Sequence, residues 1–220
     1  MAEKRRSFAV IGLGSFGATI ARDLVKFGDY VIGVDIDERR VNAVADDISE
    51  AVILDARDET ALREAGIAEC EVAMIAIGDD LEANVMAAIN ARMMGIKTVW
   101  AKAANRNHHR ILTKIGADRV IQPETEVGAT TAEMLHNPAV RDFVAIGNGL
   151  HVVNIIIPER RDGTAVSEFD LMNRFDIRLL GVMRGTKFLG DGSEDVDLEE
   201  GDRMLLLGRR AALRDFGATL

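Results

Sequence analysis

The sequence predicts an α/β protein with a doubly wound parallel sheet in its first half and a small α+β domain in its second half. In residues 1–124, short apolar runs alternate with stretches whose apolar residues recur at helical spacing. The apolar runs lack a clean alternation of apolar and polar residues, which indicates strands covered on both faces. After Pro123 the pattern changes to short β-rich runs separated by polar turns. Because strands that alternate with helices form parallel sheets, this order predicts the fold class.

The strands of the first domain each coincide with one apolar run, and they are expected at residues 8–11, 30–35, 51–54, 72–77, 98–102 and 119–121. The helices between them are expected at residues 17–27, 38–48, 59–65, 82–94 and 107–115. Glycine follows most of these helices, and glycine readily adopts the left-handed conformation that ends a helix. In such a sheet the ligand crevice lies at the carboxyl ends of the strands, where the strand order reverses.

The remainder of the chain divides into a linker or crossover helix at 125–145 and a C-terminal domain at 146–220. A helix is expected at 126–135, broken by Asn137-Pro138, with a further helical turn at 138–143. The C-terminal domain is expected to contain strands at 152–157, 177–183, 187–189 and 203–207, with helices at 166–171 and 210–216. Arg184-Gly185-Thr186 has the composition of a hairpin turn.

A glycine motif follows the first strand, with Gly12, Gly14 and Gly17 in the spacing G-x-G-x-x-G, and Asp35 ends the second strand. Gly12 permits the tight turn, Gly14 lets the backbone approach a phosphate, and Gly17 lets the helix pack against the strand. Phosphate oxygens then accept hydrogen bonds at the helix N-terminus, and the acid accepts from ribose hydroxyls. This order predicts a Rossmann-like nucleotide-binding domain; the alternative is a glycine turn required by packing alone.

The net charge of −9 and the sequence pI near 5.0 argue against a nucleic-acid partner and against direct binding to anionic lipid. No apolar run is long enough for a transmembrane helix, and the N-terminal run is too short and glycine-rich for a secretory signal. A cytoplasmic protein is therefore expected. The single cysteine, Cys70, excludes an internal disulfide and a site built from several cysteines.

Five segments resemble the RCK family, the regulators of potassium conductance: 8–17, 34–37, 76–78, 115–124 and 197–208. The chain is most similar to the cytosolic gating subunits of bacterial Ktr and Trk potassium-uptake systems. The resemblance implies that the first domain binds an adenine nucleotide, ATP or ADP in Ktr-type subunits, with NAD(H) also linked to Trk-type subunits. It implies a dimer that assembles into an octameric ring, peripheral to the inner face of the cell membrane. A membrane potassium channel or transporter subunit would be the partner, gated when nucleotide exchange changes the ring.

The motif and the resemblance together give the candidate nucleotide-binding residues Gly12, Gly14, Ser15, Phe16, Gly17, Asp35, Ile36, Arg57, Ile77, Gly78 and Lys102. Ser15 departs from the family pattern, in which an arginine reaches the terminal phosphate of ATP. A hydroxyl is a weaker phosphate donor than a guanidinium, so this position leaves the ATP-over-ADP preference open. Arg39, Arg57 and Lys102 are candidate substitutes. Asp35 would repel a 2′-phosphate, which argues against NADP and leaves ATP, ADP, AMP and NAD(H) open.

Three further acids have two interpretations each. By resemblance, Glu124 binds a divalent cation, Mg²⁺ or Ca²⁺, at a subunit junction; the alternative is a turn acid. Asp79 and Asp80 contact a ligand or cap the following helix. An alternative function is an NAD-dependent oxidoreductase, but the C-terminal domain offers His151 as its only histidine and no catalytic spacing. Other Rossmann-type redox or nucleotide sensors remain open, as does a second ligand such as cyclic di-AMP in the C-terminal domain.

Overall fold

The computed structural model describes residues 5–190 and 195–220. The chain forms two compact units, one ending at Glu124 and the other beginning at Thr125. Each unit has its own hydrophobic core, so each can be understood from its own residues.

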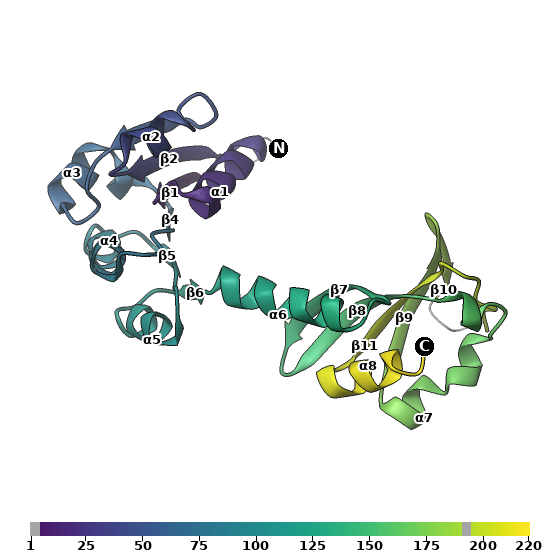
Figure 1. The fold of residues 1–220 in the computed structure, drawn as a ribbon. Helices are drawn as coiled ribbons and strands as arrows, with labels where there is room; N and C mark the ends of the chain where they lie inside the picture. Colours follow the sequence, from purple (N-terminus) through teal and green to yellow (C-terminus); the bar gives the residue numbers. More distant parts are fainter. Residues whose placement is uncertain (1–4, 191–194) are drawn as a thin grey trace. The chain divides into compact units, whose positions relative to one another are not determined.

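The first unit is built on a six-stranded parallel sheet with the strand order β3-β2-β1-β4-β5-β6 (Figure 1). The strands are β1 (Ser7–Ile11), β2 (Tyr30–Asp35), β3 (Glu50–Ile53), β4 (Val72–Ile75), β5 (Thr98–Lys102) and β6 (Arg119–Ile121). β1 lies in the middle of the sheet and pairs in parallel with β2 on one side and with β4 on the other. The strand order therefore reverses between β1 and β4. This is the Rossmann-like doubly wound order that the sequence predicts, and its switch point lies where β1 and β4 end.

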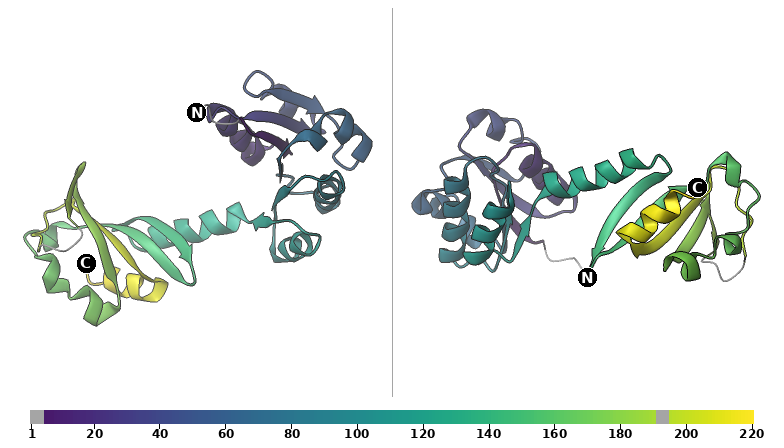
Figure 2. Two further views of the ribbon diagram at one scale, coloured as in Figure 1. Left: turned by 180° about the vertical axis from the view of Figure 1, so that it is seen from behind. Right: turned by 60° about the horizontal axis from the view of Figure 1, so that its bottom comes forward.

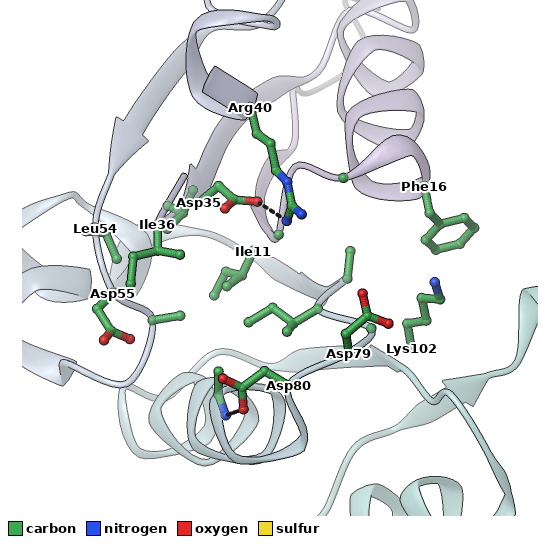
Figure 3. Close-up of a pocket in the computed structure, with 18 of the residues that line it drawn as sticks. Ile11, Phe16, Asp35, Ile36, Arg40, Leu54, Asp55, Asp79, Asp80 and Lys102 are labelled. Atoms are coloured by element: carbon green, nitrogen blue, oxygen red, sulfur yellow. Dashed lines mark hydrogen bonds and ion pairs between the residues drawn. The ribbon is translucent and has the colours of Figure 1, made fainter. Parts of the chain in front are cut away.

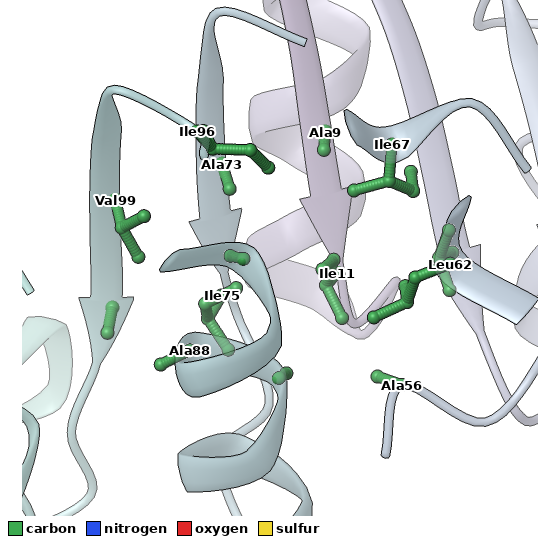
Figure 4. Packing of buried hydrophobic residues seen from close by; sticks show 14 of the residues in the cluster. Ala9, Ile11, Ala56, Leu62, Ile67, Ala73, Ile75, Ala88, Ile96 and Val99 are labelled. Carbon is green, nitrogen blue, oxygen red and sulfur yellow. The ribbon is translucent and has the colours of Figure 1, made fainter. Parts of the chain in front are cut away.

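Helices cover both faces of this sheet. They are α1 (Ser15–Lys26), α2 (Glu38–Asn42), α3 (Glu59–Glu64), α4 (Leu81–Met93) and α5 (Arg106–Lys114), with a 3₁₀ turn at Ile67–Glu69. Alternate residues of β1 enter different cores: Ala9 and Ile11 pack with residues of α3, α4 and α5, whereas Phe8 and Val10 pack with residues of α1 and α2. Figure 4 shows the first of these clusters, with Ile11 beside Leu62 and Ile75. Burial on both faces explains the unbroken apolar strands.

The second unit contains a five-stranded antiparallel sheet with the strand order β10-β9-β11-β8-β7. Its strands are β7 (Val140–Gly147), β8 (Leu150–Ile156), β9 (Arg178–Arg184), β10 (Lys187–Gly190) and β11 (Arg203–Arg209). The helices are α6 (Pro123–His136), which begins in the first unit, α7 (Leu171–Phe175) and α8 (Arg210–Gly217), with 3₁₀ turns at Glu159–Arg161 and Val166–Phe169. α8 lies along one face of the sheet (Figure 2), where Leu213 and Phe216 join the core.

Two expectations about local structure are wrong, and the helix expected at 166–171 is instead a 3₁₀ turn followed by α7. The segment 138–143 is not a helical turn, because Val140–Gly147 forms the edge strand β7, which pairs with β8. The hairpin that joins them turns at Gly147-Asn148-Gly149, and all three residues have positive φ. The second error is the length of α2, which ends at Asn42 rather than continuing to Ile48. In the described residues, no helix has the length and apolar character needed to cross a membrane.

Candidate nucleotide site at the switch point

The turn after β1 requires glycine at two positions. Gly12 has a φ of +100°, and a Cβ atom built there would lie 2.9 Å from backbone atoms of Ala76 and Ile77 at the end of β4. A Cβ atom at Gly17 would lie 1.9 Å from the carbonyl oxygen of Gly12. The Gly12 N–H also donates to the Val34 carbonyl at 2.7 Å, which joins this turn to β2. The glycine turn is therefore fixed in place between the ends of β2 and β4.

Gly14 has a different environment. It is the N-cap of α1, and a Cβ atom built there would have no heavy atom within 4 Å. Gly14 has no side chain to cap the helix, and the first helical residues, Ser15 and Phe16, line the same cavity. Backbone N–H groups in the first turn of a helix have no partner within the helix, and the helix dipole favours an anion there. Packing does not explain this glycine, and the open space beside it leaves room for a ligand to approach the first turn of α1.

Asp35 ends β2 at the opposite side of the turn and is 6% exposed. Its Oδ2 accepts a hydrogen bond from the Leu13 N–H at 2.7 Å, and its Oδ1 accepts from the Asp37 N–H at 2.9 Å. A carboxylate oxygen has room for a second hydrogen bond, so Asp35 holds the glycine turn and can still accept from a ribose hydroxyl. Asp35 thus has a structural role in addition to the ligand role that the sequence predicts.

Two arginines line the cavity near Asp35, and both are paired with carboxylates that line it too. Arg40 Nη1 lies 3.5 Å from Asp35 Oδ2 (Figure 3). Arg57 Nη2 lies 2.6 Å from Asp55 Oδ2. Their hydrogen bond lowers the pKa of Asp55 and raises the pKa of Arg57. Neither arginine therefore offers an uncompensated positive charge to a phosphate.

Lys102 lies at the other end of the cavity, at the end of β5. Figure 3 shows its ammonium group close to the ring of Phe16, and Nζ is 5.7 Å from the ring centroid. Its Nζ also lies 2.5 Å from Oε1 of Glu124 in the first turn of α6. This hydrogen bond is the main reason why the pKa of Glu124 is lowered. Lys102 therefore places a positive charge beside Phe16, in the first turn of α1.

Two acids, Asp79 and Asp80, follow β4. Asp80 caps α4 by accepting from the Ala83 N–H at 2.9 Å, so the helix-cap interpretation applies to Asp80. The buried Asn84 on α4 donates to the Lys102 carbonyl at 2.9 Å and to the carbonyl of Ile77. These two bonds tie the ends of β4 and β5 together below the cavity. Asp79 lines the cavity without being placed by such a cap.

The cavity has a volume of about 460 Å³, within the usual range for small-molecule sites. Ten of the predicted residues line it: Gly12, Gly14, Ser15, Phe16, Asp35, Ile36, Arg57, Ile77, Gly78 and Lys102. Gly17 is buried behind the turn, and Glu124 reaches the cavity only through Lys102. Arg39, a candidate phosphate cation in the sequence, is not part of the lining, and its neighbour Arg40 takes that place.

The residues present fit an adenine nucleotide, because an uncapped helix N-terminus, an unfilled space at Gly14 and a buried acid share one cavity. They do not by themselves fit a divalent cation. Among the described residues, no group of three histidine, cysteine, aspartate or glutamate side chains is placed to hold a metal ion. Glu124 supplies one carboxylate, which is paired with Lys102.

The fold and the cavity define a protein of the Rossmann class whose switch point has the chemistry of a nucleotide site. Residues 8–123 match the TrkA-N domain, so the chain belongs to the TrkA-N family, the N-terminal domain of RCK proteins.

Similarity to known proteins extends over both units. The chain is 34% identical to the Ktr system potassium uptake protein A of Vibrio alginolyticus, over 92% of each chain. It is 31% identical to the protein of the same name from Bacillus subtilis, over 97% of this chain and 96% of that one. The solved structure of the GsuK channel bound to NAD has a TM-score of 0.65 at 15% identity. It covers 97% of this chain, which spans 39% of the GsuK chain, and GsuK has also been solved with ADP. At this identity GsuK shows the fold alone.

Proposed function

We propose that this protein is a regulatory subunit that binds an adenine nucleotide and controls potassium uptake through a membrane partner of the Ktr or Trk type. The observation that carries the proposal is the cavity at the switch point, in a chain that matches Ktr system potassium uptake protein A over both units. ADP and ATP are the proposed ligands, with NAD(H) as a further candidate, since GsuK binds NAD and ADP. Nucleotide exchange would act by favouring one conformation of the assembly over another.

The nucleotide is proposed to lie with its ribose at Asp35 and Ile36 and its phosphates at Gly14, Ser15 and the first turn of α1. The phosphate end of the cavity is lined by Ile77, Gly78 and Lys102, and the ribose end by Arg40 and Arg57. The turn between them is shaped by Gly12 and Gly17. Ser15 is exposed and brings a hydroxyl without charge, so discrimination between ATP and ADP rests on other groups.

Assembly is proposed as a dimer and then an octameric ring at the inner face of the membrane, held there by the partner subunit. A divalent cation, Mg²⁺ or Ca²⁺, at Glu124 requires a second carboxylate, which a second copy of the chain can supply across a twofold axis. Glu124→Gln is expected to weaken the activation of potassium uptake by the divalent cation. Potassium uptake that responds to the cation as in the unaltered protein would contradict this role.

The role is proposed as non-catalytic. The relatives that match both units are Ktr system potassium uptake proteins, which supports a regulatory role. Hydride transfer between NAD and a small substrate would favour the oxidoreductase alternative.

The experiment is calorimetric titration of the purified protein with ADP, ATP, AMP, NAD, NADH and NADPH. We expect ADP and ATP to bind and NADPH to be rejected. The second arm is growth at low potassium of an uptake-deficient bacterium that expresses a Ktr-type membrane subunit with or without this chain. Growth should require this chain, and Gly14→Ala should reduce it. Failure of every adenine nucleotide to bind would overturn the proposal.

A further inference from the structure

Lys102 differs from the other cations of the cavity in where its partner lies. Among the described lining residues, three cations are present, and Arg40 and Arg57 pair with Asp35 and Asp55, which line the same cavity. Lys102 pairs with a carboxylate outside the lining, on Glu124. A phosphate that replaced the partner of either arginine would leave an uncompensated carboxylate inside the cavity. Lys102 can change partner without that cost.

The two members of the pair also differ in exposure. The Lys102 side chain is 13% exposed, whereas the Glu124 side chain is 67% exposed. Glu124 can therefore regain water when the pair opens, and pairs with an exposed member contribute little stability. The Lys102 ammonium group has no comparable access to water. An anionic partner therefore stabilises it, and the charge of a phosphate inside the cavity is screened less by solvent than that of an exposed carboxylate.

The surroundings of Lys102 keep its head group at the phosphate end. Its backbone carbonyl is held by Asn84, and its Nζ lies over the ring of Phe16. A Cβ atom at Gly78 would lie 3.3 Å from Nζ, so the missing side chain at Gly78 leaves the ammonium group its approach to the cavity. The uncapped first turn of α1, which begins at Ser15, lines the same cavity.

We propose that Lys102 exchanges partners, from the Glu124 carboxylate to a nucleotide phosphate, and that Glu124 competes with the phosphate for this lysine. This inference rests on the proposed function and adds the regulation of the same site. Phosphate binding releases Glu124 in the first turn of α6, the helix that continues from the first unit into the second. The Lys102–Glu124 pair thus opens only when a phosphate is bound. Adenosine has no phosphate and leaves the pair intact.

The test is a double-mutant cycle read by calorimetric titration with two probes, ADP and adenosine, in EDTA so that no divalent cation contributes. Lys102→Gln should weaken ADP binding about 10- to 100-fold, the scale of hydrogen bonds to charged groups, and leave adenosine binding unchanged. Glu124→Gln should tighten ADP binding about two- to fivefold, the scale of an exposed ion pair, again without effect on adenosine. In the Lys102→Gln background, Glu124→Gln should no longer affect ADP binding.

The outcomes distinguish a failure of the partner exchange at Lys102 from a failure of the proposed nucleotide binding. If Glu124→Gln weakens ADP binding or leaves it unchanged, the competition is refuted while nucleotide binding stands. If Lys102→Gln weakens ADP and adenosine equally, Lys102 acts by supporting the cavity rather than by binding phosphate, and the exchange is refuted. Adenosine binding also shows that each variant is folded. If neither ADP nor adenosine binds the unaltered protein, the proposed function fails and the exchange fails with it.

Discussion

Gly14 and Gly17 lie in one motif, and the structure assigns them separable roles. Gly14→Ala places a methyl group where the structure has no heavy atom within 4 Å, at a φ of −64° that alanine adopts without strain. Gly17→Ala places a methyl group 1.9 Å from the Gly12 carbonyl oxygen. The first change should impair ligand binding with little loss of stability, and the second should impair stability itself.

The structure sets the size of each effect. Gly17→Ala forces the turn away from α1, and overpacking of this kind costs about 3 kcal/mol of unfolding free energy, at the upper end of the usual range. Gly14→Ala costs at most about 1 kcal/mol, because alanine is a poorer N-cap than glycine. Its methyl group blocks the approach of a phosphate to the first turn of α1. Loss of one hydrogen bond to a charged group weakens ADP binding about 10- to 100-fold.

Urea denaturation followed by circular dichroism measures the stability of both variants, and calorimetric titration with ADP measures affinity. Gly28→Ala serves as a control for alanine substitution outside the cavity. Its φ of +92° predicts a modest loss of stability with ADP affinity unchanged. ADP affinity of Gly14→Ala equal to that of the unaltered protein would refute the placement of phosphate at this turn. Unchanged stability of Gly17→Ala would refute the packing argument.

Three further predictions concern single side chains. Asp35→Asn should weaken ADP binding by about 1–3 kcal/mol in calorimetry, the scale of hydrogen bonds to a charged group. The control Asp37→Asn keeps the cap of α2 and should leave ADP affinity within about twofold. Equal losses in the two variants would contradict a specific role for Asp35. Ser15→Arg should raise the ATP-to-ADP affinity ratio, and an unchanged ratio would remove the terminal phosphate from this position. Burial raises the pKa of the Cys70 thiol to about 11, so about one thiol in a thousand is ionised at pH 8. A thiol reagent should modify Cys70 only after denaturation; rapid modification of the native protein would contradict this.

The glycine motif and the acid after β2 could be predicted from the sequence because each has a local physical cause. Gly12 needs a positive φ and Gly17 a close helix–strand approach, and both requirements follow from a tight turn between a strand and a helix. The parallel order of the strands followed similarly from their unbroken apolar runs.

The choice between Arg39 and Arg40 could not be made from the sequence. Successive residues of a helix point about 100° apart, so which arginine faces the cavity depends on where α2 begins. Asp37 decides this by capping the helix through the Arg39 N–H at 2.9 Å. The pair of Lys102 with Glu124 was also not predictable, because it joins residues that only the folded sheet brings together.

The β7 strand is not evident from the sequence for a different reason. Asn137-Pro138 marks the end of α6, but the same dipeptide does not distinguish a further helical turn from a strand in the residues that follow. Val140 and Val144 favour a strand, and Gly147-Asn148-Gly149 has turn composition. Pairing with β8 decides the outcome, and that is a contact of the folded unit rather than a property of the segment.

The most direct measurement is a crystal structure of the protein with ADP bound. It should show the diphosphate at the N–H groups of Gly14, Ser15 and Phe16, the ribose hydroxyls at Asp35, and Lys102 beside a phosphate oxygen. ADP bound at another surface, or with its phosphates away from the first turn of α1, would contradict the account.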